Sequence, residues 1–432
     1  MSEELGDESG TANAGEGYYG NGGGEGGTYT EVQNESYFSG IGNSFAGICF
    51  GIILFIGAFP LLWWNEGRAV DYYQAISEGK QIIVPIDTTT INSANEGKLV
   101  YLTGLAEPTD NVMDTDFGVE ATMKTRLFRD VEMYQWKETK STRKKKNVGG
   151  GTTTVTEYLY SKSWSSTLID ASTFKTSGYT NPTFMPYSSE DFYPTAVVVD
   201  AFTLPTDLVN GISSLTPLEG TLNVTDIPSN NLLVQSMTEQ SYINGFYFGA
   251  TNSSSYLNEV IGDTRVTYLA TEGGQVSIIA MQTGATLDPY TASSGANLYL
   301  IEPGIVSSEQ MFENAKASNK TITMILRFVG FIVMATGIGL ILAPISAVAD
   351  IIPCIGDCVG AAVSIVAGLI AAAFSLTVIG IAWVANRPII LVIGGGVLAG
   401  LFLLLYSGYR TKQNKSRALN LTENPKDFEM AR

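Results

Sequence analysis

The side chains that most often carry out chemistry are scarce in this chain of 432 residues. It contains no histidine, which excludes histidine-based triads, histidine metal ligands and a histidine pH switch. No nucleophile is accompanied by a base at a recognisable spacing, and no glycine-rich phosphate loop stands between a strand and a helix. We therefore predict no catalytic residue, no cofactor and no metal site, and hence no enzyme.

Two carboxylates, Asp350 and Asp357, stand in an apolar stretch near the C-terminus. Charges at membrane depth are costly and usually functional, so these two could line a channel or transporter path. The simpler interpretation is a cytoplasmic turn between two membrane helices, because Pro353 disfavours a continuous helix there. Cys354 and Cys358 could bind a metal or carry a fatty acyl group, although two thiolates alone make a weak metal site.

Two further motifs lie between residues 65 and 321. The basic run Arg143–Lys146 could bind lipid headgroups or acidic partners, or could be a solvated hairpin tip. Asn223 and Asn252 begin Asn-X-Ser/Thr sequons and are possible N-glycosylation sites. The chain as a whole carries a formal net charge of −17, so we expect no nucleic acid partner, because its phosphates would be repelled.

Four apolar segments must position these residues in a membrane. About 20 apolar residues cross the hydrocarbon core as a helix. Four stretches meet this length, and they predict transmembrane helices at residues 43–64, 322–349, 358–385 and 388–406, with a turn at 350–357. The fold class is thus a membrane α+β protein with four transmembrane helices and a large β-rich extracytoplasmic domain between the first and second.

The orientation follows from the charges beside the last span. Basic residues are concentrated in the tail at 407–432, which the positive-inside rule places in the cytoplasm. Four spans put the N-terminus on the same side. The first 42 residues are acidic and glycine-rich, and we expect them to be disordered. The domain at residues 65–321 would then be lumenal.

This domain reads mainly as strands. Residues alternate between apolar and polar at Arg126–Lys137, and Thr and Tyr are frequent at Thr152–Trp164. These two segments predict a long hairpin with a flexible basic tip at Lys140–Gly151. Further strands are expected at Leu99–Leu102, Thr195–Val199, Arg265–Ala270, Gln275–Gln282 and Asn297–Ile301, and short helices at Val70–Glu78 and Ser307–Ala317.

Small residues recur four apart in two predicted spans. The pairs are Gly47 with Gly51 and Gly396 with Gly400. Glycine lets helices approach closely. The spacing is explained either by packing inside one bundle or by self-association of two chains.

Several local motifs in this order resemble one family, LUMA or transmembrane protein 43. The resemblance covers about residues 45–410. Its most specific part is the Met-Tyr-Gln-Trp strand with flanking glutamates. The motif residues, structural or partner-binding, are Asn65, Glu66, Gly67, Arg68, Asn95, Glu96, Gly97, Met133, Tyr134, Gln135, Trp136, Gly262, Asp263, Arg265, Asp350, Pro353, Asp357, Arg387 and Pro388.

The resemblance implies four spans and a large domain in the endoplasmic reticulum lumen or perinuclear space. It implies residence in the endoplasmic reticulum and inner nuclear membranes, self-association, and nuclear-envelope partners such as emerin and lamins. It implies no catalytic activity.

The leading hypothesis is a non-enzymatic membrane scaffold in contact with the lipid bilayer, acting as a homo-oligomer. A channel or transporter subunit that uses Asp350 and Asp357 is one alternative. A lumenal membrane-bound enzyme, which would need a pocket with converging carboxylates, is the other.

Overall fold

The computed structural model describes residues 18–20, 26–148, 151–220, 222–252, 254–349, 353–387, 406–407 and 410. The predicted fourth span at 388–406 lies outside these residues except for its last one, and so do Asp350, Pro388 and most of the C-terminal tail.

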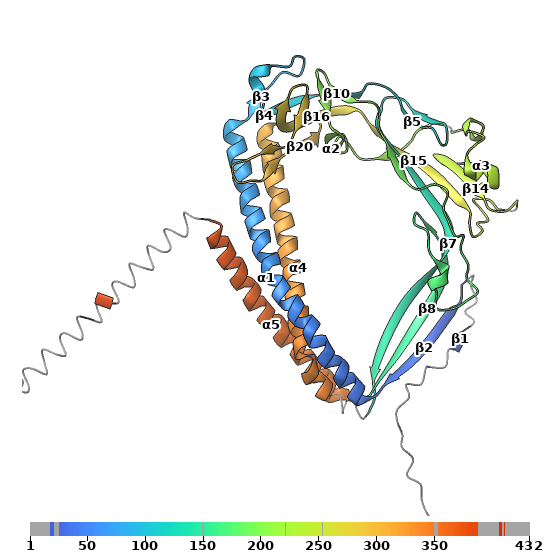
Figure 1. The fold of residues 1–432 in the computed structure, drawn as a ribbon, viewed down its shortest axis with the longest axis vertical. Helices are drawn as coiled ribbons and strands as arrows, with labels where there is room; N and C mark the ends of the chain where they lie inside the picture. Colours follow the sequence, from blue (N-terminus) through green and yellow to red (C-terminus); the bar gives the residue numbers. More distant parts are fainter. Residues whose placement is uncertain are drawn as a thin grey trace, which may run out of the picture.

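Three long helices pack against one another, as Figure 1 shows. They are α1 (Tyr37–Ile82), α4 (Ser308–Ala349) and α5 (Pro353–Ala385). Among the described residues, the helical segments Ser44–Ile82, Ser308–Ala349 and Gly356–Ala385 are long and apolar enough to cross a membrane. These three agree in position with the first three predicted spans.

The first helix continues far beyond its apolar part. We predicted a separate short helix at Val70–Glu78, but α1 runs without a break to Ile82. It does so because the helical face that carries Ala75 and Ile76 remains buried beyond the apolar part. The predicted helix at Ser307–Ala317 is confirmed as the start of α4, and it leads directly into the second apolar segment.

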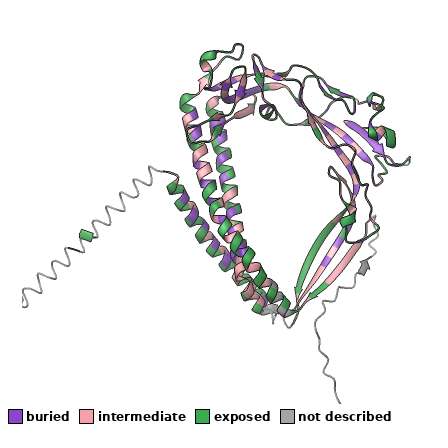
Figure 2. Ribbon diagram, viewed as in Figure 1, coloured by how far each residue is buried: buried purple, intermediate pink, exposed green. Residues whose placement is uncertain are grey.

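Side chains on the apolar halves of these helices face outward. Figure 2 shows many exposed residues on the halves of α1 and α4 farthest from the barrel, and along α5. Large apolar side chains are among them, including Phe50, Ile53, Phe328 and Leu376. Such an apolar surface is expected where a helix contacts lipid and is unusual in water.

Glycines bring α1 and α4 together. A Cβ atom added at Gly51 would lie 2.7 Å from the carbonyl oxygen of Gly337, which real Cβ atoms do not tolerate. A Cβ added at Gly337 would meet the backbone nitrogen of Phe55 at 2.7 Å. Gly51 is therefore used for packing within one chain. Gly396 and Gly400 lie outside the described residues.

We expect Gly51→Ala to destabilise the helix bundle by about 1–3 kcal/mol, because the added methyl group forces the two backbones apart. Gly57→Ala is the matched control: it lies on the same helix, and an added Cβ there meets nothing within 4 Å. Thermal unfolding in detergent measures both. Equal melting temperatures for the two variants would contradict the close approach.

Five strands close into a small barrel beside the upper ends of α1 and α4 (Figure 1). In pairing order they are β4 (Leu99–Pro108), β10 (Val197–Val199), β11 (Phe202–Leu204), β17 (Thr286–Asp288) and β16 (Gly274–Thr283), which pairs with β4 again. Strands β3 (Val84–Pro85) and β20 (Leu300–Pro303) extend this sheet. Val100, Phe202 and Ile278 are fully buried in its core.

The barrel is packed onto the helices. Ala75 and Ile76 of α1 and Met311 and Phe312 of α4 form one buried cluster with Ile279 of β16. The cluster makes the upper halves of both helices part of the soluble domain. The barrel is thereby held to the membrane helices by a shared core.

A second sheet extends from the barrel. Its strand order is β1-β2-β8-β7-β15-β14-β13, with β9 and β12 paired at its side. The bounds are β1 (Tyr18–Gly20), β2 (Thr28–Glu35), β8 (Thr152–Ser165), β7 (Lys124–Lys146), β15 (Thr264–Glu272), β14 (Gly245–Gly249), β13 (Thr238–Tyr242), β9 (Glu190–Phe192) and β12 (Thr216–Pro217).

The remaining elements are short. They are β5 (Val112–Asp114), β6 (Val119–Ala121), α2 (Thr206–Val209), α3 (Leu232–Ser236), β18 (Tyr290–Thr291) and β19 (Asn297–Leu298), with one-turn helices at Ser93–Asn95, Ala171–Thr173 and Val224–Asp226. Most predicted strands are present with longer bounds, but the one at Thr195–Val199 is shorter, and the one at Asn297–Ile301 is divided into β19 and β20, which belong to different sheets.

The hairpin tip differs from the prediction. We expected a flexible tip at Lys140–Gly151, but β7 stays paired with β8 as far as Lys146, which lies opposite Thr152. Thr and Val on β8 are strongly strand-forming and carry the ladder through the basic run.

The N-terminal tail also differs. We expected residues 1–42 to be disordered, whereas Thr28–Glu35 form β2 and pair with β8 from Thr28 opposite Leu159 to Glu35 opposite Thr152. A strand that precedes the first span thus shares a sheet with the domain that follows it. In Figure 1, β2, β7 and β8 run toward the N-terminal end of α1. We predicted that the N-terminal tail and the domain lie on opposite sides of the membrane. That placement does not allow β2 to pair with β8.

Candidate functional site

The Asn-Glu-Gly-Arg motif lies on α1 where its apolar part ends. Glu66 is buried, and its carboxylate accepts two hydrogen bonds from Arg327 of α4, from Nε at 2.6 Å and from Nη2 at 2.7 Å. This bidentate geometry is the strongest form of such a pair. Glu66 and Arg327 therefore join the two helices at the boundary between apolar and polar halves.

The other motif residues extend this junction. Asn65 donates to the carbonyl oxygen of Thr323 at 3.1 Å. Arg68 donates to Oδ1 of Asn319 and to Oγ1 of Thr323, each at 3.1 Å. Asn319 in turn donates to the carbonyl oxygen of Ala69 at 3.0 Å. We name this the boundary junction; its polar members are Asn65, Glu66, Arg68, Asn319, Thr323 and Arg327.

The end of α5 reaches the same place. Asn386, the residue after α5, lies beside Gly67: a Cβ added at Gly67 would meet its Oδ1 at 3.6 Å, an ordinary van der Waals distance. Arg387 follows, with its guanidinium 4.4 Å from the ring centre of Trp383. The structure therefore brings Arg387 next to the Asn-Glu-Gly-Arg motif, although more than three hundred residues separate them in sequence.

Two other motifs meet on neighbouring strands. Met133 of β7 lies opposite Thr264 of β15. Tyr134 donates its backbone N–H to the carbonyl oxygen of Asp263 at 2.8 Å and accepts from Gly262 at 2.9 Å. Arg265 pairs with Glu132 at 2.6 Å. The Met-Tyr-Gln-Trp strand and the Gly-Asp-Thr-Arg segment thus form one contact.

Gln135 and Trp136 anchor the segment that follows β8. Gln135 is buried, donates to the carbonyl oxygen of Thr167 at 3.0 Å and accepts from the backbone of Ile169 at 2.8 Å. The backbone N–H of Trp136 donates to Asn181 at 2.7 Å. These contacts are structural, since they use the polar atoms to hold a loop.

Asp263 is the best example of a carboxylate fully used by the fold. It is buried and accepts from the backbone N–H groups of Ala250 and Val260, each at 2.7 Å, and from the hydroxyl of Tyr247. Burial and the nearby Asp263 raise the pKa of Tyr247, which therefore stays protonated as a donor. Gly262, the residue before Asp263, has φ +97°, a conformation that favours glycine.

The Asn95-Glu96-Gly97 motif forms the turn into β4. Gly97 has φ +71° and donates to the carbonyl oxygen of Gln282 at 2.9 Å. Glu96 accepts from the backbone of Gly284 at 2.8 Å. The motif closes the barrel edge between β4 and β16.

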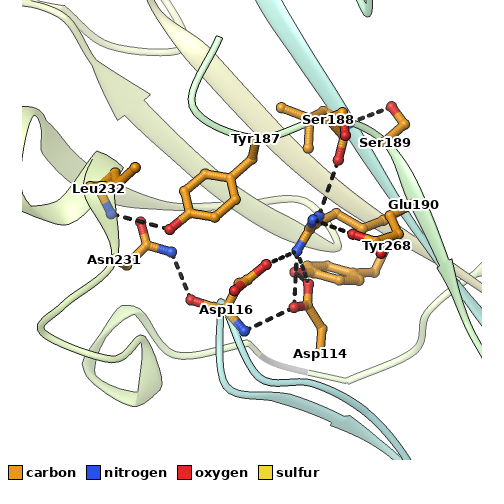
Figure 3. Close-up of polar contacts among 11 residues, drawn as sticks. Asp114, Asp116, Tyr187, Ser188, Ser189, Glu190, Asn231, Leu232 and Tyr268 are labelled. Atoms are coloured by element: carbon orange, nitrogen blue, oxygen red, sulfur yellow. Dashed lines mark hydrogen bonds and ion pairs between the residues drawn. The ribbon is translucent and has the colours of Figure 1, made fainter.

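A buried charge network that the sequence did not reveal lies in the large sheet, as Figure 3 shows. Arg129 of β7 is buried and donates to both carboxylate oxygens of Asp114, at 2.9 and 2.8 Å. It also pairs with Asp116 and Glu190, each at 3.0 Å. Tyr268 donates to Asp114 at 2.7 Å. The network ties together β5, β7, β9 and β15.

The electrostatics of this network are those of a structural centre. Burial alone would lower the pKa of Arg129, but Asp114 and Asp116 raise it above its ordinary value. Burial and Asp114 raise the pKa of Tyr268 well above its ordinary value, so Tyr268 remains a donor. Arg129 is thereby held as a cation and Tyr268 as a neutral donor.

The Asp-containing turn gives no support to an ion path among the described residues. Asp357 is exposed and pairs with Lys146 of the hairpin tip at 3.1 Å. Pro353 begins α5, and Cys358 is an exposed free thiol. The described part of the chain has no group of three or more Cys, Asp or Glu side chains placed to hold a metal ion.

The described part of the chain has several surface cavities. One of about 860 Å³ is lined by the segment that spans residues 168–183, and Asp170 is the carboxylate among its lining residues. Asp170 accepts from the backbone of Ser172 at 2.9 Å and so stabilises the turn in which it lies.

Asn223 and Asn252 are both exposed, as glycosylation would require.

Comparison with known proteins finds similarity to one family. A family model described as Transmembrane protein 43 matches residues 133–388. Transmembrane protein 43 from Homo sapiens is 28% identical over 357 residues, which cover 79% of this chain and 85% of the relative. The Rattus norvegicus protein is 27% identical over 374 residues, 83% and 89% of the two chains, and the Drosophila melanogaster homolog is 26% identical over 349 residues, 79% and 89%. No solved structure matches the chain.

Proposed function

This chain belongs to the transmembrane protein 43 family, and on that premise we propose that it is a non-enzymatic scaffold held in a membrane by its apolar helices. It is a membrane protein whose described part contains three helices long enough to span. In this proposal the β-rich domain presents binding surfaces to other proteins at a fixed height above the bilayer.

The observation that supports a scaffold best is the unbroken course of α1 and α4 from the apolar region into the barrel core. One buried stripe on α4 includes Phe312, Asn319, Thr323, Gly330 and Gly337 and continues through both halves. The Glu66–Arg327 pair joins α4 to α1 at the boundary. A domain built onto its membrane anchors in this way suits the task of holding partners in place.

We place the scaffold in the endoplasmic reticulum and inner nuclear membranes, with self-association and partners of the emerin and lamin kind. The family resemblance supports this placement. The predicted orientation puts both termini in the cytoplasm or nucleoplasm; the pairing of β2 with β8 bears directly on that orientation, and a test is given in the Discussion.

Two copies of the full chain with different tags, expressed together, are expected to purify together from mild detergent. A multi-pass membrane protein of other fold, carrying one of the tags, is the control. Proximity labelling from the C-terminal tail and then from the middle domain would identify the neighbours on each side. A strictly monomeric chain that captures no partner from either position would refute the scaffold.

A further inference from the structure

A groove lies beside the boundary junction, between α1, α4 and the end of α5. It has a volume of about 390 Å³. Its wall includes Glu66 and Tyr73 from α1, Lys316, Lys320 and Arg327 from α4, and Trp383 and Arg387 at the end of α5. The apolar part of α1 ends at Trp63 and Trp64, so the groove stands at the height where a bilayer meets water.

The groove is positive although the chain is strongly negative. Its lining has four cationic side chains and two carboxylates, in a chain whose net charge is −17. The carboxylate of Glu66 forms an ion pair with Arg327. The carboxylate of Glu313 forms ion pairs with Lys80 at 2.7 Å and with Lys316 at 3.7 Å. Lys320 and Arg387 form no ion pair within the described part of the chain.

A further positive charge stands behind the groove. Arg68 is half-buried, and its hydrogen bonds go to neutral groups, on Asn65, Asn319 and Thr323. Its Nε atom is buried without a hydrogen-bond partner. A cation in partly desolvated surroundings, without a carboxylate beside it, strengthens the attraction of the groove for an anion.

The surroundings favour an amphipathic anion over a soluble one. Met324 lines the groove, and Phe328 stands one turn further along α4; both are largely exposed, at 55% and 64%. Trp383 lines the opposite side, and tryptophan is enriched at the headgroup level of membranes. A ligand with a charged head and an acyl chain would cover the apolar side chains while its head lies in the groove.

We propose that this groove binds the phosphate headgroup of an anionic phospholipid. Lys316, Lys320 and Arg387 contact the phosphate, and Met324 and Phe328 contact the acyl chain. The bound lipid would neutralise the positive excess between the three helices. It would thereby link lipid composition to the packing of α5 against α1 and α4.

The full chain in nanodiscs tests this. Dioctanoyl phosphatidic acid, dioctanoyl phosphatidylcholine and inorganic phosphate are titrated separately, and native mass spectrometry reports the bound lipid. The variant Lys316→Gln with Lys320→Gln removes two exposed cations from the groove. Lys98→Gln with Lys137→Gln removes two exposed cations from the β-rich domain, outside both the groove and the basic run Arg143–Lys146, and changes the net charge equally.

We expect phosphatidic acid to bind the unaltered chain and the control variant alike, and the groove variant about tenfold or more weakly, as loss of two headgroup contacts implies. Phosphatidylcholine and inorganic phosphate should bind much more weakly to all three. Equal affinity of the groove variant and the unaltered chain overturns the site. Binding of inorganic phosphate as tight as that of phosphatidic acid overturns the lipid as its ligand.

Discussion

Thr30→Cys combined with Glu157→Cys is expected to form a disulfide within one chain in most molecules, once the native cysteines are replaced by serine. Thr30 on β2 lies directly opposite Glu157 on β8. Facing residues in an antiparallel pair have Cα atoms about 4.5–5.5 Å apart, inside the range that a disulfide bridges. Electrophoresis under non-reducing conditions, after mild oxidation in membranes, measures the product.

Thr30→Cys with Thr153→Cys is the matched control. Thr153 lies on the same strand but opposite Asn34, four residues from the expected partner and therefore about 13 Å away along the strand. The control pair should stay reduced under the same conditions.

The result decides between two arrangements of the whole chain. Residue 30 precedes the first apolar segment and residue 157 follows it. If the two positions lay on opposite faces of a bilayer, about 30 Å of hydrocarbon would separate them and no disulfide could form. A disulfide in the first pair alone establishes that tail and domain meet. Reduced cysteines in both pairs would restore the opposite-side placement.

Arg129→Met is expected to cost about 3–5 kcal/mol, the usual loss when one partner of a buried ion pair is removed. The cost arises because Asp114, which is fully buried, loses its guanidinium partner. The melting temperature of the β-rich domain in the full chain, followed by circular dichroism in detergent, measures the effect.

Arg126→Met is the matched control on the same strand. Arg126 pairs with Asp191 at 2.7 Å, but both side chains are partly exposed, at 21% and 34%. Loss of such a pair costs about 1 kcal/mol or less. Adding Asp114→Asn to Arg129→Met should recover part of the stability, because it removes the buried carboxyl group that has lost its partner. Similar losses in the two arginine variants would contradict the buried network.

The periodic elements were predictable because their signal is local. Alternation at Leu127, Val131 and Met133 marks β7, and all three are buried as an alternating strand requires. The apolar helices follow from length alone. The continuation of α1 to Ile82 could not be predicted from the length of an apolar segment, because the second half of α1 is buried by packing against the barrel.

The contacts between distant segments could not be predicted. Arg129 looks like any arginine in a strand, and its partners come from β5 and β9. The pairing of β2 with β8 joins residues more than a hundred positions apart. The short strand β2 could not be predicted because the tail around it is glycine-rich and acidic. The resemblance did find the boundary junction on α1, but not its partners Asn319 and Thr323.

Because α1 is unbroken, a change in the tilt of its apolar part also moves its upper end, which packs on the barrel. From Trp64 to Ile82 the helix rises about 27 Å at 1.5 Å per residue. A change of 10° in the tilt of the apolar part therefore swings the barrel end sideways by about 5 Å. Membrane helices adjust their tilt to bilayer thickness. We therefore expect a change in bilayer thickness to displace the barrel laterally.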